Sequence, residues 1–268
     1  MRITSNDFTL IDRIRDDVPL IHHITNLVSI QDSANVTLHM GASPVMAHAK
    51  EEVEEMVAAS AALVLNIGTL TQEQVEAMIL AGKKANALGT PVIFDPVGVG
   101  ATTFRTEMAR RILAEVEIEI IKGNAGEIAT LAGERAEMRG VDTGHVTADV
   151  EEVAISLADG WKTVIVTGAT DIVTDGRRVA HVHNGHPLMG ALTGTGCMAA
   201  SVIASCAAVE RDYWLAATVG LATYGIAGER GAQQAATPAH FKVHFFDALA
   251  TVSAENVNKS ARIEVDQV

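Results

Sequence analysis

Short, mostly apolar runs alternate with longer amphipathic stretches along this chain of 268 residues. The runs end in polar or glycine residues, as the buried strands of parallel sheets commonly do. They are 62–68, 92–98, 118–124 and 164–171. We expect each run to form a strand of one sheet whose two faces are both covered.

Helical patterns fill the stretches between these runs. The stretch 71–87 opens with a Thr cap, and another helix is expected to begin at Glu127. The Ala-rich segment 197–228 is almost free of charge apart from 210–212, which predicts two packed helices joined by a charged turn. This alternation predicts an α/β fold with a mostly parallel central sheet flanked by helices. No linker or repeat interrupts it, so we expect a single domain over 1–268.

Polar side chains collect where these strands end. They are Asn66, Asp95, Asn124, Glu127 and Thr167. Ligands bind outside the carboxyl ends of parallel strands, so a site is expected there. Asp95 and Glu127 suit Mg²⁺, which prefers oxygen ligands and is often held by one or two carboxylates and nucleotide phosphates. Alternatively, Asp95 is a turn residue and Glu127 a charge at a helix N-terminus, and the residues alone leave both interpretations open.

A glycine-rich segment, 193–197 (TGTGC), leads directly into an apolar helical pattern. Backbone N–H groups at a helix start are unpaired, and glycines let them approach a phosphoryl oxygen closely. The segment is not a Walker A loop, because the G-x-x-x-x-G-K-[ST] pattern is missing. Cys197 falls in the first helical turn, where the helix dipole should lower its pKa and make it a base or a substrate contact. The alternatives are an ordinary turn and a small buried residue, and we prefer the second for Cys206.

The histidines raise the question of a zinc site. The candidates are His22, His23, His181, His183 and His186. In an extended segment His181 and His183 share one face, but we expect no Cys or carboxylate nearby to complete a site. We therefore interpret these residues as ordinary surface or strand histidines.

Composition restricts the partners and the compartment. A formal net charge of −13 argues against nucleic acid and anionic membranes as partners. The segment 1–17 lacks the apolar stretch of a signal peptide, and no run reaches membrane-spanning length. Cys197 and Cys206 are too far apart on one predicted helix for an unstrained disulfide. We expect a cytoplasmic protein with reduced thiols.

The segment 22–49, HHITNLVSIQDSANVTLHMGASPVMAHA, resembles the N-terminal signature of hydroxyethylthiazole kinases. The likeness continues in the family's order to about Cys206, through LVLNIGTL, PVIFDPVGVGAT, IKGNAGEI, VTGATD and GHPLMGALTGTGCM. It implies a ribokinase-like fold and Mg²⁺-dependent transfer of the γ-phosphoryl group of ATP to 4-methyl-5-(2-hydroxyethyl)thiazole, in thiamine biosynthesis or salvage. It also implies a homotrimer with the thiazole site at the subunit boundary.

The resemblance assigns roles to individual residues. These are thiazole contacts for Asn26, Met46, Gly68 and Gly194, ATP contacts for Lys122, Thr167, Gly194, Thr195 and Gly196, magnesium binding for Asp95 and Glu127, and catalysis for Cys197. The chain departs from the family where the motif commonly reads Arg-Gly-Asn-Ala-Ser-Glu, because Lys122 and Gly126 replace the Arg and the Ser. Lysine keeps the charge but not the bidentate geometry, so we expect weaker or differently oriented ATP binding.

Three other functions are alternatives to this one. They are a hydroxymethylpyrimidine kinase, an ATP-dependent repair enzyme for hydrated nicotinamide cofactors, and a thiazole- or nucleotide-binding protein without catalysis. The segment 22–49 argues against the first two, and the retained Asp95, Glu127 and 194–197 argue against the third. We expect in-line transfer in which Cys197 helps only modestly, since a loose phosphoryl transition state needs little prior deprotonation of the alcohol.

Overall fold

The computed structural model describes residues 3–133, 138–139, 142–143, 150–158 and 163–268. Within them, nine strands form one sheet in the order β11-β10-β9-β8-β5-β4-β3-β1-β2, and β6 pairs with β7 separately. The strands are β1 Leu20–Ile24, β2 Ser43–Val45, β3 Ala62–Asn66, β4 Val92–Asp95, β5 Ile120–Asn124, β6 Met138–Arg139, β7 Asp142–Thr143, β8 Thr163–Thr167, β9 Asp171–Thr174, β10 Arg178–Val182 and β11 Ile263–Gln267. Strands β2, β1, β3, β4, β5 and β8 run parallel, whereas β9, β10 and β11 extend the sheet in antiparallel fashion.

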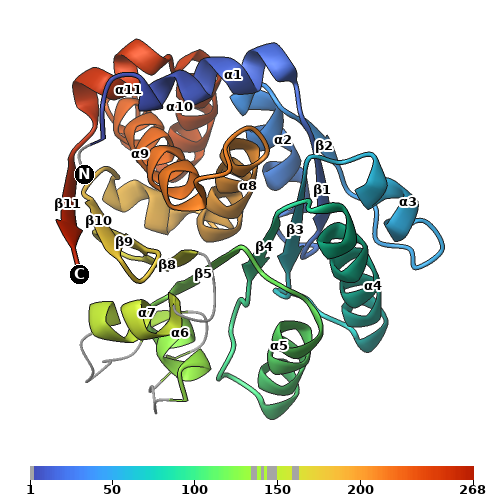
Figure 1. Ribbon diagram of the computed structural model, residues 1–268. Helices are drawn as coiled ribbons and strands as arrows, with labels where there is room; N and C mark the ends of the chain where they lie inside the picture. Colours follow the sequence, from blue (N-terminus) through green and yellow to red (C-terminus); the bar gives the residue numbers. More distant parts are fainter. Residues whose placement is uncertain (1–2, 134–137, 140–141, 144–149, 159–162) are drawn as a thin grey trace.

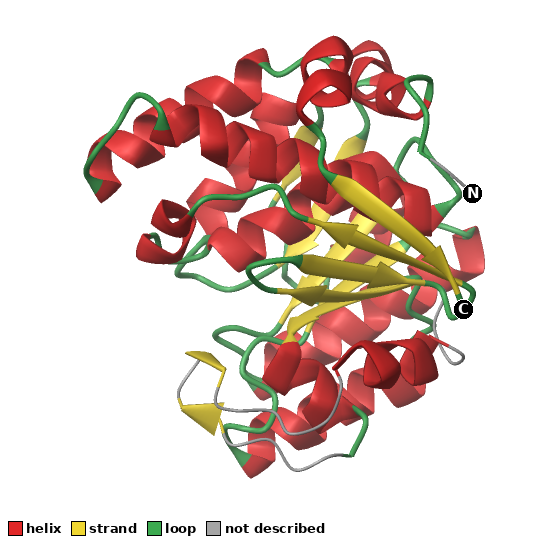
Figure 2. Cartoon of the chain, turned by 90° about the vertical axis from the view of Figure 1, so that its left-hand side faces the viewer, coloured by secondary structure: helices red, strands yellow, loops and turns green. Residues whose placement is uncertain are grey.

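Helices cover both faces of this sheet, which makes a three-layered α/β structure (Figures 1 and 2). One face carries α1 Leu10–Asp17, α2 Ile30–Met40, α8 Thr195–Ala207, α9 Tyr213–Ala232, α10 Pro238–Thr251 and α11 Ala254–Ser260. The other carries α3 Val53–Ala58, α4 Gln72–Leu88, α5 Thr103–Glu115, α6 Ala125–Leu131 and α7 Val150–Ala158, and two short 3-10 helices, η1 Asp7–Thr9 and η2 Pro187–Ala191, complete the fold. In the described part of the chain, no helix is both long and apolar enough to cross a membrane.

The predicted strands are confirmed with one correction. Runs 62–68, 92–98 and 118–124 contain β3, β4 and β5, but the run 164–171 is not a single strand. It is divided between β8 and β9 by a turn in which the Gly168 N–H donates to Asp171 Oδ1 at 2.9 Å. A glycine and a short carboxylate that bonds to a nearby backbone group favour such a turn over continued extension. The turn reverses the chain and starts the antiparallel part of the sheet.

The predicted helices are also confirmed, and their caps explain where they begin. Thr71 accepts a hydrogen bond from the Gln74 N–H at 3.1 Å, so α4 fills the predicted stretch 71–87 almost completely. The helix expected at Glu127 begins two residues earlier, because Asn124 and Glu127 form a reciprocal capping box. The segment 197–228 forms α8 and α9, with the charged residues 210–212 between them.

Alternation along the central strands divides the core into two layers. Ile93 packs among the residues beneath α8 and α9, whereas Phe94 packs against the layer that contains α4 and α5. Ile120 and Ile121 are divided in the same way. Successive side chains of a strand point to opposite faces, so residues two positions apart lie on the same face. Asp95, two positions after Ile93, therefore faces α8.

His23 shows the same alternation on β1 and predicts a pH effect on stability. Its ring is buried beneath α8, with Nε2 3.1 Å from Ser201 Oγ, and burial lowers its pKa from 6.5 to about 4. The unfolded chain takes up this proton near pH 6.5 and the folded chain only near pH 4. The contribution of neutral His23 to the free energy of unfolding is thus fully present above pH 6.5 and is lost as the pH falls towards 4.

We expect the free energy of unfolding of the wild type to fall by up to about 3 kcal/mol more than that of His23→Gln over this pH range. Urea denaturation at a series of pH values measures the difference. His48→Gln, at an exposed position, should follow the wild type. Parallel pH curves for the wild type and His23→Gln would show that His23 does not stay neutral in the folded protein.

Candidate functional site

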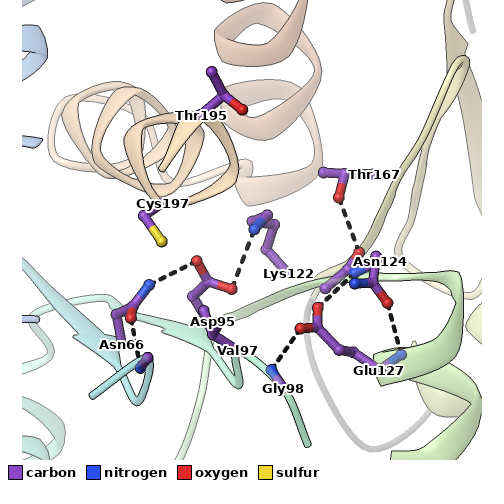
Figure 3. A network of polar contacts seen from close by, with 12 residues as sticks. Asn66, Asp95, Val97, Gly98, Lys122, Asn124, Glu127, Thr167, Thr195 and Cys197 are labelled. Carbon is purple, nitrogen blue, oxygen red and sulfur yellow. Dashed lines mark hydrogen bonds and ion pairs between the residues drawn. The ribbon is translucent and has the colours of Figure 1, made fainter. Parts of the chain in front are cut away.

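Three polar side chains on neighbouring strands face the start of α8. They are Asn66 on β3, Asp95 on β4 and Lys122 on β5. Each lies two positions after a residue that packs in the layer beneath α8 and α9; these residues are Val64, Ile93 and Ile120. Alternation therefore places all three on the α8 side of the sheet, where Figure 3 shows them below the helix. Asn124 and Thr167 end β5 and β8 in register with each other.

Asp95 is the centre of a buried polar network. One carboxylate oxygen lies 3.1 Å from Lys122 Nζ, and the other accepts a hydrogen bond of 2.8 Å from Asn66 Nδ2 (Figure 3). All three side chains are buried. An uncompensated charge in such surroundings would be very unfavourable, so each of these groups depends on the others.

The pKa values in this network follow from burial and neighbouring charge. Burial opposes the charge of Lys122, but the carboxylates of Asp95 and then Glu127 outweigh it and raise the pKa of the ammonium. Burial raises the pKa of Asp95, and Lys122 and Asn66 offset this only in part. Two carboxylates near Lys122 are enough to outweigh its burial, whereas the single cation near Asp95 is not, so the pKa values of both groups are raised. A fixed positive charge therefore lies beneath the helix start.

Asn26, in the loop after β1, connects this network to α8. Its Nδ2 group donates to Asn66 Oδ1 at 2.9 Å and lies 3.3 Å from Cys197 Sγ. Its Oδ1 accepts hydrogen bonds from the Ser29 N–H and hydroxyl, at 2.9 and 3.0 Å. A Cβ at Gly68 would lie 2.8 Å from Asn26 Cβ, so only glycine allows this approach. Asn26 and Gly68 are thus direct neighbours beside Cys197.

The helix start itself is held from several sides. Gly194 has φ +86° and caps α8, and a Cβ there would lie 2.7 Å from Ser29 Cβ. A Cβ at Gly196 would lie 3.3 Å from Lys122 Nζ, so the ammonium lies close under the first turn. Tyr224 Oη donates to the Thr195 carbonyl at 2.9 Å. The arrangement combines unpaired N–H groups, the positive end of a helix dipole and a buried cation, which together favour an anion.

Cys197 lies in the first turn of α8, as predicted, but the expected low pKa is wrong. Burial raises the pKa of the thiol, and the negative charge of Asp95 raises it further. Lys122 acts in the opposite direction and does not outweigh these effects. The helix dipole stabilises an anion by only about 1 kcal/mol, which is less than a buried thiolate loses in solvation. Cys197 is therefore a neutral thiol at neutral pH. Cys206 is fully buried, as expected.

Glu127 serves as both a helix cap and a loop anchor. Its Oε2 accepts the Asn124 N–H at 2.8 Å, and its Oε1 accepts the Gly98 N–H at 2.7 Å (Figure 3). Glu127 therefore does lie at a helix N-terminus, as the alternative interpretation expects. Burial and then the negative charge of Asp95 raise the pKa of Glu127, so the two carboxylates repel each other. A cation between them would relieve this repulsion.

These carboxylates fit the demands of Mg²⁺ without forming a complete protein cage. Among the described residues, no cluster of at least three His, Cys, Asp or Glu side chains has the geometry of a metal site. Mg²⁺ commonly uses only one or two carboxylates and completes its shell with water and substrate phosphates. Each carboxylate oxygen already in a hydrogen bond keeps further lone-pair capacity. The donor chemistry therefore suits a magnesium ion that arrives with a nucleotide.

A cavity of about 640 Å³ opens beside the start of α8. Among its lining residues are Thr167, Asp171, Thr195, Gly196, Leu221 and Tyr224. Thr167 Oγ1 also donates to the Gly123 carbonyl at 3.3 Å, next to Lys122. Three of the residues expected to contact ATP thus border one space of a size that suits a nucleoside.

Met46 is the expected thiazole contact that lies apart from this network. It follows the edge strand β2, so β1 separates it from β3 and β4. Sequence reasoning missed three residues that contact the site. The Ser29 N–H and hydroxyl donate to Asn26 Oδ1, Arg105 donates to the Gly68 carbonyl, and Tyr224 donates to the Thr195 carbonyl. Only the position of Ser29 within the segment 22–49 offered a signal for any of them.

The predicted pair of histidines on β10 is confirmed: His181 and His183 share a face, with ring centroids 6.5 Å apart. Each has a carboxylate nearby, since His181 is 2.6 Å from Glu151 and His183 is 3.7 Å from Glu264. Pairing of β10 with β11 and packing of α7 bring these distant parts of the chain together. His22 and His23 are buried on β1 and contact Ala47 and Ser201.

Comparison with known proteins agrees with this site. Residues 11–255 match the family described as the hydroxyethylthiazole kinase family. The hydroxyethylthiazole kinase of Thermoanaerobacter pseudethanolicus is 53% identical over 260 residues, which cover 96% of this chain and 98% of that protein.

Solved structures show the same relationship. A hydroxyethylthiazole kinase from Pyrococcus horikoshii superposes with a TM-score of 0.90 at 39% identity, over 98% of this chain and all of that one. A ribokinase-like superfamily protein from Enterococcus faecalis gives a TM-score of 0.62 at 12% identity, over 93% of this chain and 90% of that one, and so shows the fold alone. This chain has the ribokinase-like fold and belongs to the hydroxyethylthiazole kinase family.

Proposed function

We propose that this protein transfers the γ-phosphoryl group of ATP to the hydroxyl of 4-methyl-5-(2-hydroxyethyl)thiazole, a step in thiamine biosynthesis or salvage. One observation carries the proposal: the buried Asn66–Asp95–Lys122 network lies directly beneath the glycine-rich start of α8, between Cys197 and the cavity beside Thr167. This arrangement offers an anion site with a substrate side and a nucleotide side. Family membership supports the same reaction.

In this mechanism the protein acts chiefly by positioning and by electrostatics. The N–H groups of 194–197 and the Lys122 ammonium hold the transferring phosphoryl group. Asn26, Gly68, Gly194 and Met46 hold the thiazole, so that its hydroxyl lies near Cys197, and Thr167 and Thr195 contact the nucleotide. Asp95 and Glu127 would hold Mg²⁺, which offsets phosphate charge when bound. The departure to Lys122 leaves a point charge in place of a bidentate guanidinium, so we still expect weaker ATP binding than an arginine would give.

We further infer a single domain, a homotrimer and a cytoplasmic location. The sheet is continuous from β2 to β11, which supports one domain over 1–268. Leu27 and Val28, next to Asn26, are 70% and 66% exposed, and a second copy that covers them would place the thiazole site at a subunit boundary. Dependence on ATP and two free cysteines support the location.

The Cys197 variants test the catalytic assignment. Because the thiol is neutral, we expect Cys197→Ser to keep measurable turnover and Cys197→Ala to lower kcat by about tenfold to a hundredfold. Steady-state kinetics with saturating ATP measures both. Cys206→Ala, on the same helix but away from the site, should leave kcat unchanged. Wild-type kcat in Cys197→Ala would remove this residue from the reaction.

The deciding experiment measures ADP release by the purified protein with ATP and Mg²⁺. Hydroxyethylthiazole should stimulate release strongly, whereas hydroxymethylpyrimidine should not. Stimulation by the pyrimidine alone would assign the protein to the other kinase activity. Thiazole binding without ADP release would instead identify a binding protein that has lost catalysis.

A further inference from the structure

Arg105, in the first turn of α5, joins two loops of the site. Its Nη1 donates to the carbonyl of Val97 at 2.7 Å and also to that of Ile67, and its Nη2 donates to the carbonyl of Gly68 at 3.1 Å. Ile67 and Gly68 follow β3, whereas Val97 follows β4. The guanidinium therefore connects the loops that leave two neighbouring strands.

Each of these loops carries residues of the proposed reaction. In the first loop, the Gly68 N–H donates to Asn66 Oδ1 at 2.9 Å, and Gly68 packs against Asn26. In the second loop, the Gly98 N–H donates to Glu127 Oε1 at 2.7 Å, and Gly98 lies in the turn that follows Asp95. One loop thus borders the thiazole side of the site and the other borders the carboxylates.

The chemistry of Arg105 suits a clamp and not an ion pair. Its guanidinium donates hydrogen bonds to backbone carbonyls, and burial lowers the pKa of this group, with Glu127 acting in the opposite direction. The planar guanidinium holds its N–H donors at fixed angles, so it can bind carbonyls of two loops at once. A lysine ammonium does not have this geometry. The Thr102 hydroxyl also accepts the Arg105 N–H at 3.2 Å, which fixes the backbone from which the side chain extends.

We propose that Arg105 is a positioning residue that holds the Gly68 loop against the Val97 loop and so sets the distance between the thiazole hydroxyl and the metal–phosphate assembly. The inference rests on the proposed function and adds to it a residue that touches neither substrate. A displacement of about 1 Å between reacting groups lowers rates by about a hundredfold, so a loose clamp would be visible in kinetics.

Arg105→Met keeps most of the unbranched apolar stem but removes the guanidinium and all its donors, and Arg105→Lys keeps one charged donor group. Arg110→Met is the matched control, because Arg110 is exposed on the same helix. For Arg105→Met we expect the KM for hydroxyethylthiazole to rise at least about tenfold and kcat to fall about tenfold to a hundredfold, with the KM for ATP changed less than about twofold. Arg105→Lys should recover only part of the loss, and Arg110→Met should match the wild type.

Amide hydrogen exchange of the segments 66–71 and 96–100 gives a readout independent of activity. Exchange should be faster in both segments for Arg105→Met and unchanged for Arg110→Met. Thiazole kinetics equal to those of Arg110→Met would overturn the proposal, as would unchanged exchange. If Arg105→Met does not fold, Arg105→Lys decides by the same two measurements. Failure of the wild type to release ADP with thiazole would refute the proposed function instead, and exchange alone would then decide whether the clamp exists.

Discussion

Asp95→Asn should lower kcat for thiazole phosphorylation by at least about a thousandfold, on the scale of losing a preorganised group that acts on transition-state charge. Asparagine keeps the shape of the side chain and can still bond to Asn66, but it removes the negative charge beside Lys122. The loss should appear in kcat more than in the KM for thiazole, because Asp95 lies on the phosphate side of the network.

Stability measurements separate this chemical role from a structural one. Asp95→Asn leaves the buried Lys122 charge without its closest partner, which costs about 3–5 kcal/mol for a buried pair. In the double variant Asp95→Asn/Lys122→Met the unpaired charge is gone, so much of the stability should return while activity stays absent. Glu115→Gln, which breaks surface pairs with Lys83 and Arg111, should leave stability almost unchanged, because solvent screens exposed ion pairs. Recovery of activity together with stability in the double variant would make Asp95 a structural residue only.

Much of the fold and site could be predicted because the signals are local. The apolar runs and the polar residues that end them placed Asn66, Asp95 and Thr167 at one edge of the sheet, and the structure brings them together there. Strand alternation then puts Asp95 and Lys122 on the α8 side, where the glycine-rich helix start lies. Each of these steps depends only on residue order and on the geometry of strands.

The remaining features depend on contacts that residue types do not announce. Arg105 binds carbonyl oxygens, which every residue carries, so no pattern marks its partners. Glu264, the carboxylate 3.7 Å from His183, lies far along the chain and comes close only because β11 pairs with β10. The pKa of Cys197 depends on how deeply the first turn of α8 is buried, which the helix pattern does not specify. In each case tertiary packing decides the outcome.

Gly194→Ala should lower kcat/KM by at least about a hundredfold through a displaced helix start. Gly194 has φ +86°, which costs an alanine about 1–3 kcal/mol, and the new Cβ would lie 2.7 Å from Ser29 Cβ. Relief of this overlap moves either the first turn of α8 or the Ser29 segment that donates to Asn26. Both movements disturb the anion site and the thiazole contacts together, so kcat and both KM values should change.

Two further variants distinguish backbone strain from overlap. Gly89→Ala, at φ +69° in the cap of α4, places its Cβ where no atom lies within 4 Å, so it shares the strain without the overlap and should keep full activity. In a Ser29→Gly background the overlapping Cβ is absent, and adding Gly194→Ala should then cost less than about tenfold in kcat/KM. An undiminished loss in that background would assign the effect to the altered backbone at Gly194. The close approach of Ser29 to the helix start would then be a consequence of the fold and not a requirement of the reaction.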